Sequence, residues 1–276
     1  MMEAGTLIVA GLLLFALALA FYLHQTWVVQ KTVTMLKRPS ALTQDATIVQ
    51  LSDLHGKTKF LNGSVSGIVN GIKPDIVCVT GDLTNHLWQL PNVLRELGRI
   101  RCKHIYFIPG NHEWYDYMWL RKRMYSGEQY AETMNRLRRT GVMVLENECA
   151  LVPLKGGQIA VCGYDNSFYG NEREARPPAN ESIAYTIALG HSPEIVDFLQ
   201  RRRIEYNLLL AGHTHGGQIK LFGFPPGKYD HFHIGHRKLD PNRSFYINRG
   251  LGNVLIPLRI GSRPEIAVFR LGAYRK

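Results

Sequence analysis

Five apolar runs in this sequence each end in polar residues that could bind or activate a ligand. These endings are Asp53-x-His55, Gly81-Asp82, Gly110-Asn111-His112, Gly190-His191 and Gly212-His213-x-His215. A single histidine after a strand commonly has a structural role, but five such endings are hard to attribute to chance. Because the carboxyl ends of strands in α/β folds meet at one edge, we expect two Asp, one Asn and five His to gather there. The adjacent glycines remove bulk and would let a small, charged ligand approach.

The apolar runs are typical of buried strands, and segments with helical spacing separate several of them. The runs are ATIVQLSD, DIVCVTGD, HIYFIPGN, YTIALGHS and YNLLLAGH. The helical segments are residues 61–73, 87–100 and 193–203. This alternation predicts an α/β fold with βα units around a largely buried sheet. Near the end, QIKLFG, SFYINRG and EIAVFRL read as strands without intervening helices, which predicts a second sheet packed on the first.

Four of these segments, SDLHG, TGDL, PGNHEWY and AGHTHGGQIKLFG, together with Gly190-His191, resemble the motifs of the calcineurin-like metallophosphoesterase family. The resemblance covers roughly residues 46–271, and the five blocks occur in the family's order. It implies the family's four-layer α/β/β/α sandwich, which agrees with the strand pattern. The tail, from KYDHFHIG to IPLRIGSRPEIAVFRL, resembles a membrane-tethered bacterial branch. That branch includes enzymes that hydrolyse phosphodiesters or UDP-2,3-diacylglucosamine.

The resemblance implies two divalent metal ions at the gathered residues. The expected ligands are Asp53, His55 and His215 for the first ion, Asn111, His191 and His213 for the second, and Asp82 as a bridge between them. A shared carboxylate lowers the repulsion between two ions that lie about 3.5–4 Å apart. Imidazole, carboxylate and amide ligands without thiolate suit Mn, Fe or Zn, and Mn is the metal we expect. The ions would activate a hydroxide for attack on phosphorus and neutralise charge on the phosphoryl oxygens.

His112 lies in the same motif as Asn111, and the resemblance implies that it protonates the leaving oxygen. Its alternative role is support of the ligands, and Glu113 has no expected direct task. Protein Ser/Thr phosphatases of this superfamily carry G-D-x-x-D-R-G, whose second Asp orients the acid histidine. This chain has GDLTNHL instead, with Asn85 and His86 at those places. The difference argues against a protein phosphatase and leaves the orientation of His112 to another group.

The chain of 276 residues has 33 Lys and Arg against 22 Asp and Glu, a formal charge of +11. This excess favours anionic partners such as nucleic acid, phosphorylated metabolites or an acidic lipid surface. The four cysteines show neither a CxxC pair nor metal-ligand spacing, so we expect free thiols, which favour a reducing compartment, with a stray disulfide as the alternative. They are Cys78, Cys102, Cys149 and Cys162. The HFHIGH segment at residues 231–236 is interpreted as active-site wall or surface rather than a third metal site.

An uncharged apolar run, TLIVAGLLLFALALAFYL, occupies residues 6–23 and is about long enough to span a bilayer as a helix. No Lys or Arg precedes it, which argues against a secretory signal, although its ALA stretch could act as a cleavage site. Cationic residues follow it within residues 31–38, which predicts a cytoplasmic main domain. We therefore expect a single-pass anchor and a juxtamembrane tether in residues 1–45 and a metallophosphoesterase domain in residues 46–276.

These features predict a dinuclear-metal enzyme that hydrolyses a phosphodiester or pyrophosphate bond, with a lipid-linked substrate and membrane lipid as partners. The aromatic and basic segment at residues 113–125 could contact lipid or cap its own domain. The alternative enzyme is a nuclease or cyclic-nucleotide phosphodiesterase on the same metal centre, although nucleic acid is not the expected partner. An inactive membrane adaptor requires a broken ligand set, and none of the eight motif positions is broken. A basic membrane-surface binding protein would leave the strand-end residues unexplained.

Overall fold

The computed structural model describes residues 2–118, 121–165, 169–179, 182–220 and 231–273. Its first sheet has the order β1-β16-β2-β5-β6-β9 and its second the order β10-β11-β12-β13-β15-β14. The first sheet contains β1 (Gln30–Lys37), β16 (Glu265–Gly272), β2 (Ala46–Leu51), β5 (Ile76–Thr80), β6 (His104–Ile108) and β9 (Met143–Val144). The second contains β10 (Glu148–Leu154), β11 (Gly157–Gly163), β12 (Ile183–Leu189), β13 (Leu208–Ala211), β15 (Ser244–Ile247) and β14 (Gly235–Lys238).

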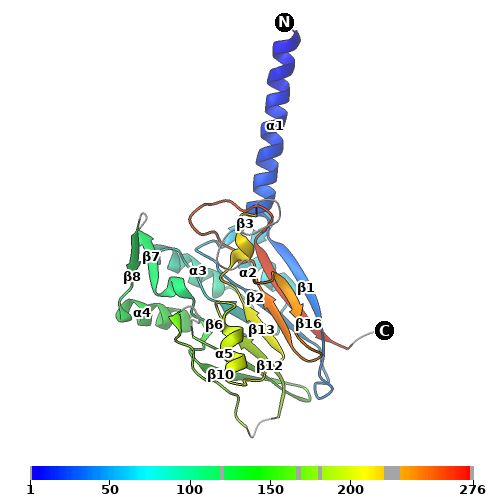
Figure 1. The fold of residues 1–276 in the computed structure, drawn as a ribbon, viewed down its shortest axis with the longest axis vertical. Helices are drawn as coiled ribbons and strands as arrows, with labels where there is room; N and C mark the ends of the chain where they lie inside the picture. Colours follow the sequence, from blue (N-terminus) through cyan, green and yellow to red (C-terminus); the bar gives the residue numbers. More distant parts are fainter. Residues whose placement is uncertain (1, 119–120, 166–168, 180–181, 221–230, 274–276) are drawn as a thin grey trace.

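Helices and short hairpins complete the fold (Figure 1). The α-helices are α1 (Met2–Trp27), α2 (Val65–Ile72), α3 (Leu90–Leu97), α4 (Gly127–Arg138) and α5 (Ile195–Arg201). The hairpins are β3 (Lys59–Phe60) with β4 (Gly63–Ser64), and β7 (Tyr115–Met118) with β8 (Arg121–Met124). Single 3₁₀ turns occur at η1 (Leu87–Gln89), η2 (Asn111–Glu113) and η4 (His215–Gly217).

The two faces of each sheet bury side chains in different layers, as the two-residue period of a strand requires. In β2, Ile48 faces the second sheet, whereas Val49 and Leu51 pack with side chains of α2, α3 and α4. In β13, Leu208 and Leu210 also lie between the sheets, and Leu209 packs with the α5 side. The layers are therefore helix, sheet, sheet and helix. The expected four-layer α/β/β/α sandwich is confirmed.

Strand direction explains why the polar strand endings can meet. β2, β5 and β6 are parallel neighbours, and β12 and β13 are parallel neighbours in the other sheet. All five of these strands were predicted from the sequence. Their carboxyl ends lie along one edge of the sandwich, so the turns that follow them converge.

Residues 30–37, expected to lie in a tether, instead form β1, which pairs in parallel with all eight residues of β16. The tail strand β16 thereby lies in the first sheet, between β1 and β2. Of the tail segments predicted as strands, SFYINRG contains β15 of the second sheet. QIKLFG gives only an isolated bridge between Ile219 and Ile260, and its residues 221–223 lie outside the described residues. The folded part of the chain thus begins soon after α1.

The expectation of four free thiols is wrong for one pair. Cys149 of β10 and Cys162 of β11 stand opposite each other in an antiparallel ladder and form a disulfide. Their separation of 13 residues matches no recognised spacing, so only the strand register reveals the pair. Cys78 is a buried free thiol and Cys102 is a partly exposed one. The inference of a reducing compartment from free thiols therefore loses its basis.

Thiol titration checks this arrangement. The protein purified without reductant and unfolded in denaturant is expected to expose two thiols, from Cys78 and Cys102, and four after reduction. The Cys102→Ser variant serves as a control and should give one thiol before reduction. Four thiols in the unreduced wild type would contradict the disulfide.

Candidate metal centre

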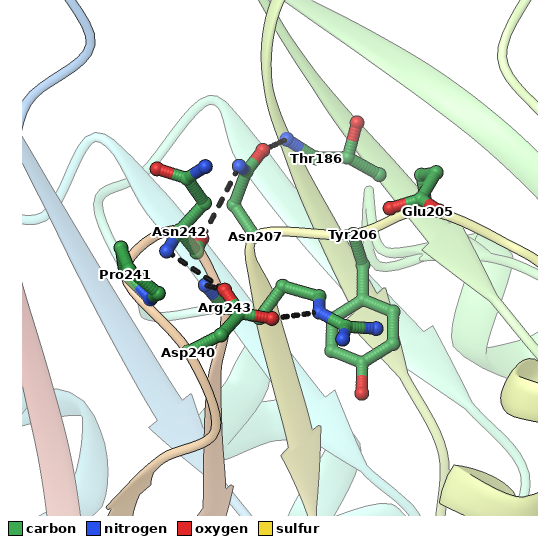
Figure 2. Close-up of a pocket in the computed structure, with 8 residues that line it drawn as sticks. All are labelled: Thr186, Glu205, Tyr206, Asn207, Asp240, Pro241, Asn242 and Arg243. Atoms are coloured by element: carbon green, nitrogen blue, oxygen red, sulfur yellow. Dashed lines mark hydrogen bonds and ion pairs between the residues drawn. The ribbon is translucent and has the colours of Figure 1, made fainter.

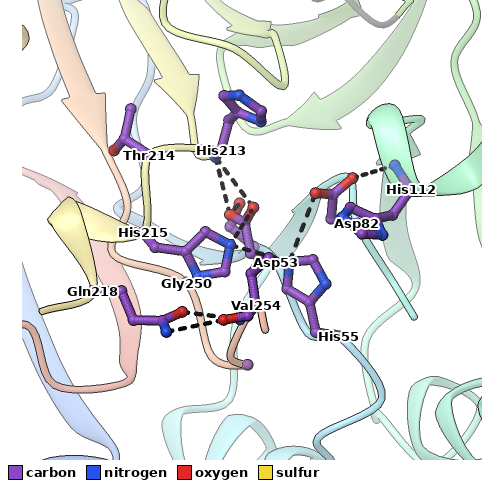
Figure 3. Close-up of polar contacts among 12 residues, drawn as sticks. Asp53, His55, Asp82, His112, His213, Thr214, His215, Gln218, Gly250 and Val254 are labelled. Carbon is purple, nitrogen blue, oxygen red and sulfur yellow. Dashed lines mark hydrogen bonds and ion pairs between the residues drawn. The ribbon is translucent and has the colours of Figure 1, made fainter. Parts of the chain in front are cut away.

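The turns after β2, β5, β6, β12 and β13 bring the predicted site residues together. Figure 3 shows Asp53, His55, Asp82, His112, His213 and His215 among them. Of the seven expected ligands, only His213 is partly exposed, and the other six are buried. Three groups of convergent ligand atoms include six of the seven, all except Asn111, and within each group the atoms lie within 4.8 Å of one another. The groups are Asp53 with His55 and His215, His55 with Asp82 and His112, and Asp82 with His191 and His213.

The group of Asp53, His55 and His215 consists of a carboxylate and two imidazoles that face one another. His55 Nε2 lies 3.0 Å from His215 Nε2, and His215 Nε2 lies 3.4 Å from Asp53 Oδ1. Metal–ligand bonds to nitrogen or oxygen are about 2.0–2.2 Å long, so ligands around one ion are separated by about 3 Å. The group has the spacing of atoms that share one cation.

The group of Asp82, His191 and His213 is centred on His191. Its Nε2 lies 3.0 Å from Asn111 Oδ1, 3.1 Å from His213 Nδ1 and 3.4 Å from Asp82 Oδ2. The same Asp82 oxygen lies 3.6 Å from His55 Nε2 of the first group. One carboxylate oxygen therefore approaches both groups.

The backbone of the site is held in a conformation that most residues avoid. Five of the seven expected ligands have positive φ, between 45° and 65°. They are Asp53, His55, Asp82, His213 and His215. Non-glycine residues in the left-handed region are uncommon, and they cluster where a site needs a particular side-chain direction. Here the sharp turns aim consecutive ligands at one centre.

The charges of the cluster suit a cation. Burial alone would raise the pKa of both Asp53 and Asp82, but the neighbouring histidines hold each pKa below its usual value. Burial opposes a charge on His191 as well, yet Asp82 raises the pKa of that imidazole to about 10. Buried carboxylates thus persist as anions and attract positive charge. The oxygen and nitrogen donors, without a thiolate, fit divalent Mn, Fe or Zn.

His112 lies beside this cluster. Its backbone N–H donates to Asp82 Oδ1 (2.8 Å), and its ring stands edge-on to His55, with 4.7 Å between the centroids. Its Nδ1 is buried and has no hydrogen-bond partner among the described residues. The ring is positioned by packing, because Tyr115 lies 4.8 Å away between centroids.

The positions that differ from the phosphatase motif do not orient His112. Asn85 donates to the carbonyls of His55 and Asn253, which closes the turn after β2 against the C-terminal loop. His86 Nδ1 lies 3.4 Å from Asp116 Oδ2. Among the described residues, packing against the rings of His55 and Tyr115 orients His112, and no side-chain acceptor bonds its Nδ1.

Glu113 and Arg259 contribute to the site in ways that the sequence did not reveal. The Glu113 carboxylate accepts hydrogen bonds from the backbone N–H groups of Asp82, Leu83 and Gly110, and so ties two ligand turns together. Burial and the Asp82 charge raise the pKa of Glu113 to about 7. In the sequence, only its place in the PGNHE segment indicated that Glu113 belongs to the site.

The guanidinium of Arg259 is fully buried and donates to three backbone carbonyls, of Arg249, Gly252 and Ser262. Its Nη2 lies 3.1 Å from His215 Nδ1. Arg259 thus braces the C-terminal loop beneath one expected ligand. Nothing in its local sequence marks it, because the contact spans 44 residues.

The other polar clusters have simpler roles. In the described part of the chain, none of the HFHIGH histidines joins a group of convergent ligands, and His233 and His236 lie against Phe245 O and Ser244 Oγ. A cavity of about 520 Å³ opens at the amino end of β13, opposite the metal cluster (Figure 2). Its polar groups bond to each other: Asn207 accepts from Thr186 N, and Asp240 pairs with Arg243. These lining groups are thus engaged with one another.

Comparison with known proteins agrees with this geometry. A family model described as calcineurin-like phosphoesterase matches residues 46–217. Metallophosphoesterase YkoQ of Bacillus subtilis is 26% identical over 81% of this chain and 83% of its own length. Phosphodiesterase YaeI of Escherichia coli is 28% identical over 81% of each protein. A bovine transmembrane protein with a metallophosphoesterase domain is 28% identical over 82% of this chain, which spans 53% of that relative's length. The chain therefore belongs to the calcineurin-like phosphoesterase family, whose members hydrolyse phosphoester bonds at a dinuclear divalent-metal centre.

Proposed function

We propose that this chain is a membrane-anchored hydrolase of phosphodiester or pyrophosphate bonds whose metal ions are manganese. The proposed ligands are Asp53, His55 and His215 for one ion, Asn111, His191 and His213 for the other, and Asp82 for both. The observation that carries this assignment is the single Asp82 oxygen that approaches His55 on one side and His191 on the other. Bound divalent ions would supply Lewis-acid activation of the phosphoester and of the attacking water.

The protein itself supplies position and a proton. The turns after five strands fix the ligands before substrate arrives, so little reorganisation is needed during the reaction. We propose that His112, held at the edge of the cluster by Asp82 and Tyr115, donates a proton to the leaving oxygen.

Replacement of His112 tests this role through its dependence on the leaving group. His112→Asn is expected to lower turnover of an alkyl phosphodiester by about 10²–10⁴-fold, the usual contribution of general acid catalysis. Turnover of bis(p-nitrophenyl) phosphate should fall much less, because p-nitrophenolate leaves without a proton. Metal content should stay at two ions, measured by elemental analysis. Equal losses on both substrates would assign His112 to ligand support instead.

The proposed substrate is lipid-linked. The 23-residue apolar segment Gly5–Trp27 of α1 is a candidate membrane span that is exposed over residues 5–21, and some relatives are transmembrane proteins. An enzyme fixed to a membrane meets phosphoesters at the bilayer surface.

An assay of the purified full chain in detergent with Mn²⁺ tests the substrate class. We expect hydrolysis of bis(p-nitrophenyl) phosphate and of a lipid-linked pyrophosphate such as UDP-2,3-diacylglucosamine, with weaker activity on p-nitrophenyl phosphate. Cleavage of monoesters alone would contradict the proposal.

A nuclease is the second candidate, because the formal charge of +11 favours polyanions. Binding to long DNA that weakens steeply with salt, while turnover of small diesters does not, would support it.

We propose a single span with a cytoplasmic catalytic domain, because the cationic residues at 31–38 follow the apolar helix. The Cys149–Cys162 disulfide argues for the opposite side, since such bonds persist mainly in oxidising compartments. Protease added to intact cells decides between them. A cytoplasmic domain should be protected, whereas a domain on the outer side should be cleaved.

A further inference from the structure

The base of α1 lies at the edge of the fold that carries the metal cluster. β1 follows α1 directly, and its first residue, Gln30, stands opposite Glu265, the first residue of β16. Because β16 runs antiparallel to β2, the start of β1 lies at the edge where β2 ends before Asp53. Figure 1 shows α1 rising from this edge, with the loop after β15 at its base.

Hydrogen bonds fix this loop to the last turns of α1. Tyr22 Oη donates to Pro257 O (3.2 Å), and Arg259 N donates to Thr26 Oγ1 (3.1 Å). Tyr22 lies five residues before Trp27, which is roughly 7.5 Å along a helix axis. A 23-residue span is about 35 Å long, slightly more than the ~30 Å hydrocarbon core, so its last residues reach the headgroups. The loop around Pro257 therefore extends to headgroup level or deeper.

Four large apolar side chains on segments at or next to the helix base are exposed. We call them the apolar rim: Leu61 (65% exposed), Trp88 (74%), Leu255 (75%) and Ile256 (54%). Leu61 N donates to Trp27 O. Leu255 and Ile256 line, with Trp27 and His55, a cavity of about 350 Å³ that also reaches Gln89, the neighbour of Trp88. Part of the rim thus borders a cavity that one expected ligand, His55, also lines.

The backbone conformation of Leu255 also favours contact between its side chain and a bilayer. Its φ is +59°, in the left-handed region that a leucine rarely adopts. The side chain is 75% exposed, so packing within the domain offsets little of this strain. A bilayer would provide the apolar contact that the protein does not.

A cationic cavity lies on the α3 side of the same helix base. Its volume is about 500 Å³, and Trp27 forms part of its wall. Four basic side chains line it against one carboxylate, that of Glu96: they are Lys57, Lys59, Arg95 and Arg99. Glu96 is already bonded to Ser66 N and paired with Arg99. The cavity therefore has an excess of positive charge that suits lipid phosphates.

We propose that the apolar rim inserts into the headgroup region of an anionic bilayer while the cationic cavity binds its phosphate groups. The cavity beside His55 then opens onto the membrane surface, and substrate enters the metal centre from the lipid rather than from bulk water. This inference rests on the proposed function in one respect, that α1 spans a membrane.

Depth measurements on the full chain test the rim. A spin label is attached at Leu255→Cys in a Cys102→Ser background and, as a matched control, at Leu239→Cys, an exposed apolar position at the opposite end of the sandwich. In vesicles of phosphatidylcholine with phosphatidylglycerol, the label at 255 should be accessible to oxygen and protected from a water-soluble nickel complex. The label at 239 should show the reverse.

The outcomes separate this inference from the proposed function. Protein that floats with vesicles but has a label at 255 as accessible to nickel as that at 239 overturns the rim insertion alone. Protein that fails to float with vesicles overturns the span and the inference together. Neither measurement depends on metal content or turnover.

The cationic cavity has its own test. In protein whose cationic cavity is unchanged, omission of phosphatidylglycerol should make the label at 255 more accessible to the nickel complex. In the Lys59→Gln, Arg95→Gln, Arg99→Gln variant, the anionic lipid should make no difference. The Arg201→Gln, Arg202→Gln, Arg203→Gln variant removes the same charge from exposed positions beside α5 and should retain the lipid effect. A lipid effect that survives in the cavity variant overturns the cavity's role.

Discussion

Asp82→Asn is expected to reduce turnover of bis(p-nitrophenyl) phosphate by at least about 10⁴-fold, which corresponds to about 5.5 kcal/mol. The reason is geometric, because Asp82 Oδ2 approaches both His55 and His191. An amide lacks the negative charge that offsets the repulsion between two divalent ions at close range. Elemental analysis after dialysis should therefore find two ions in the wild type and at most one in the variant.

Stability provides a second measurement for the same variant. A ligand that binds only the native state raises the melting temperature, so added Mn²⁺ should stabilise the wild type and a chelator should destabilise it. Asp82→Asn should respond weakly to either. Asp116→Asn is the matched control, since Asp116 is an equally buried carboxylate that pairs with Arg123 outside the cluster. Its metal content should match that of the wild type, and a two-ion Asp82→Asn enzyme with normal turnover would refute the bridging role.

The gathering of the expected ligands at one edge could be predicted from the sequence, because each lies just after a buried strand with a clear apolar pattern. β2, β5, β6, β12 and β13 are short, continuous runs, and parallel pairing brings their ends to one edge. The prediction needed no knowledge of register, since a polar residue just after any such strand arrives at that edge. At these positions the local apolar pattern is enough to predict which residues the parallel sheet brings together.

The features that the sequence did not predict depend on pairings between distant segments. β1 is an edge strand whose Val33 and Met35 are exposed, so its apolar pattern does not mark it as core. It becomes a strand only through β16, more than 200 residues later. The disulfide depends on the register of β10 against β11, and Arg259 acquires its role only when the C-terminal loop folds under His215. Residue types alone do not encode these contacts.

The carboxylate of Glu113 offers the second large effect. Its Oε2 accepts from Asp82 N (2.9 Å) and Gly110 N (2.6 Å), and its Oε1 accepts from Leu83 N (2.8 Å). Glu113→Gln replaces one of these acceptors with an NH₂ group that faces a backbone donor, so at least one buried N–H loses its partner.

Hydrogen bonds to charged groups contribute about 1.5–3 kcal/mol each, so Glu113→Gln should lower the free energy of unfolding by about 3 kcal/mol, measured by urea denaturation. Because the same N–H groups shape the turns of Asp82 and Asn111, the variant should also bind less metal and lose turnover. Glu96→Gln is the matched control: Glu96 is a buried carboxylate that accepts from Ser66 N, remote from the cluster. It should cost stability but leave the metal content at two ions. A Glu113→Gln enzyme that is destabilised like this control yet keeps both ions would show that the carboxylate supports the fold without shaping the metal centre.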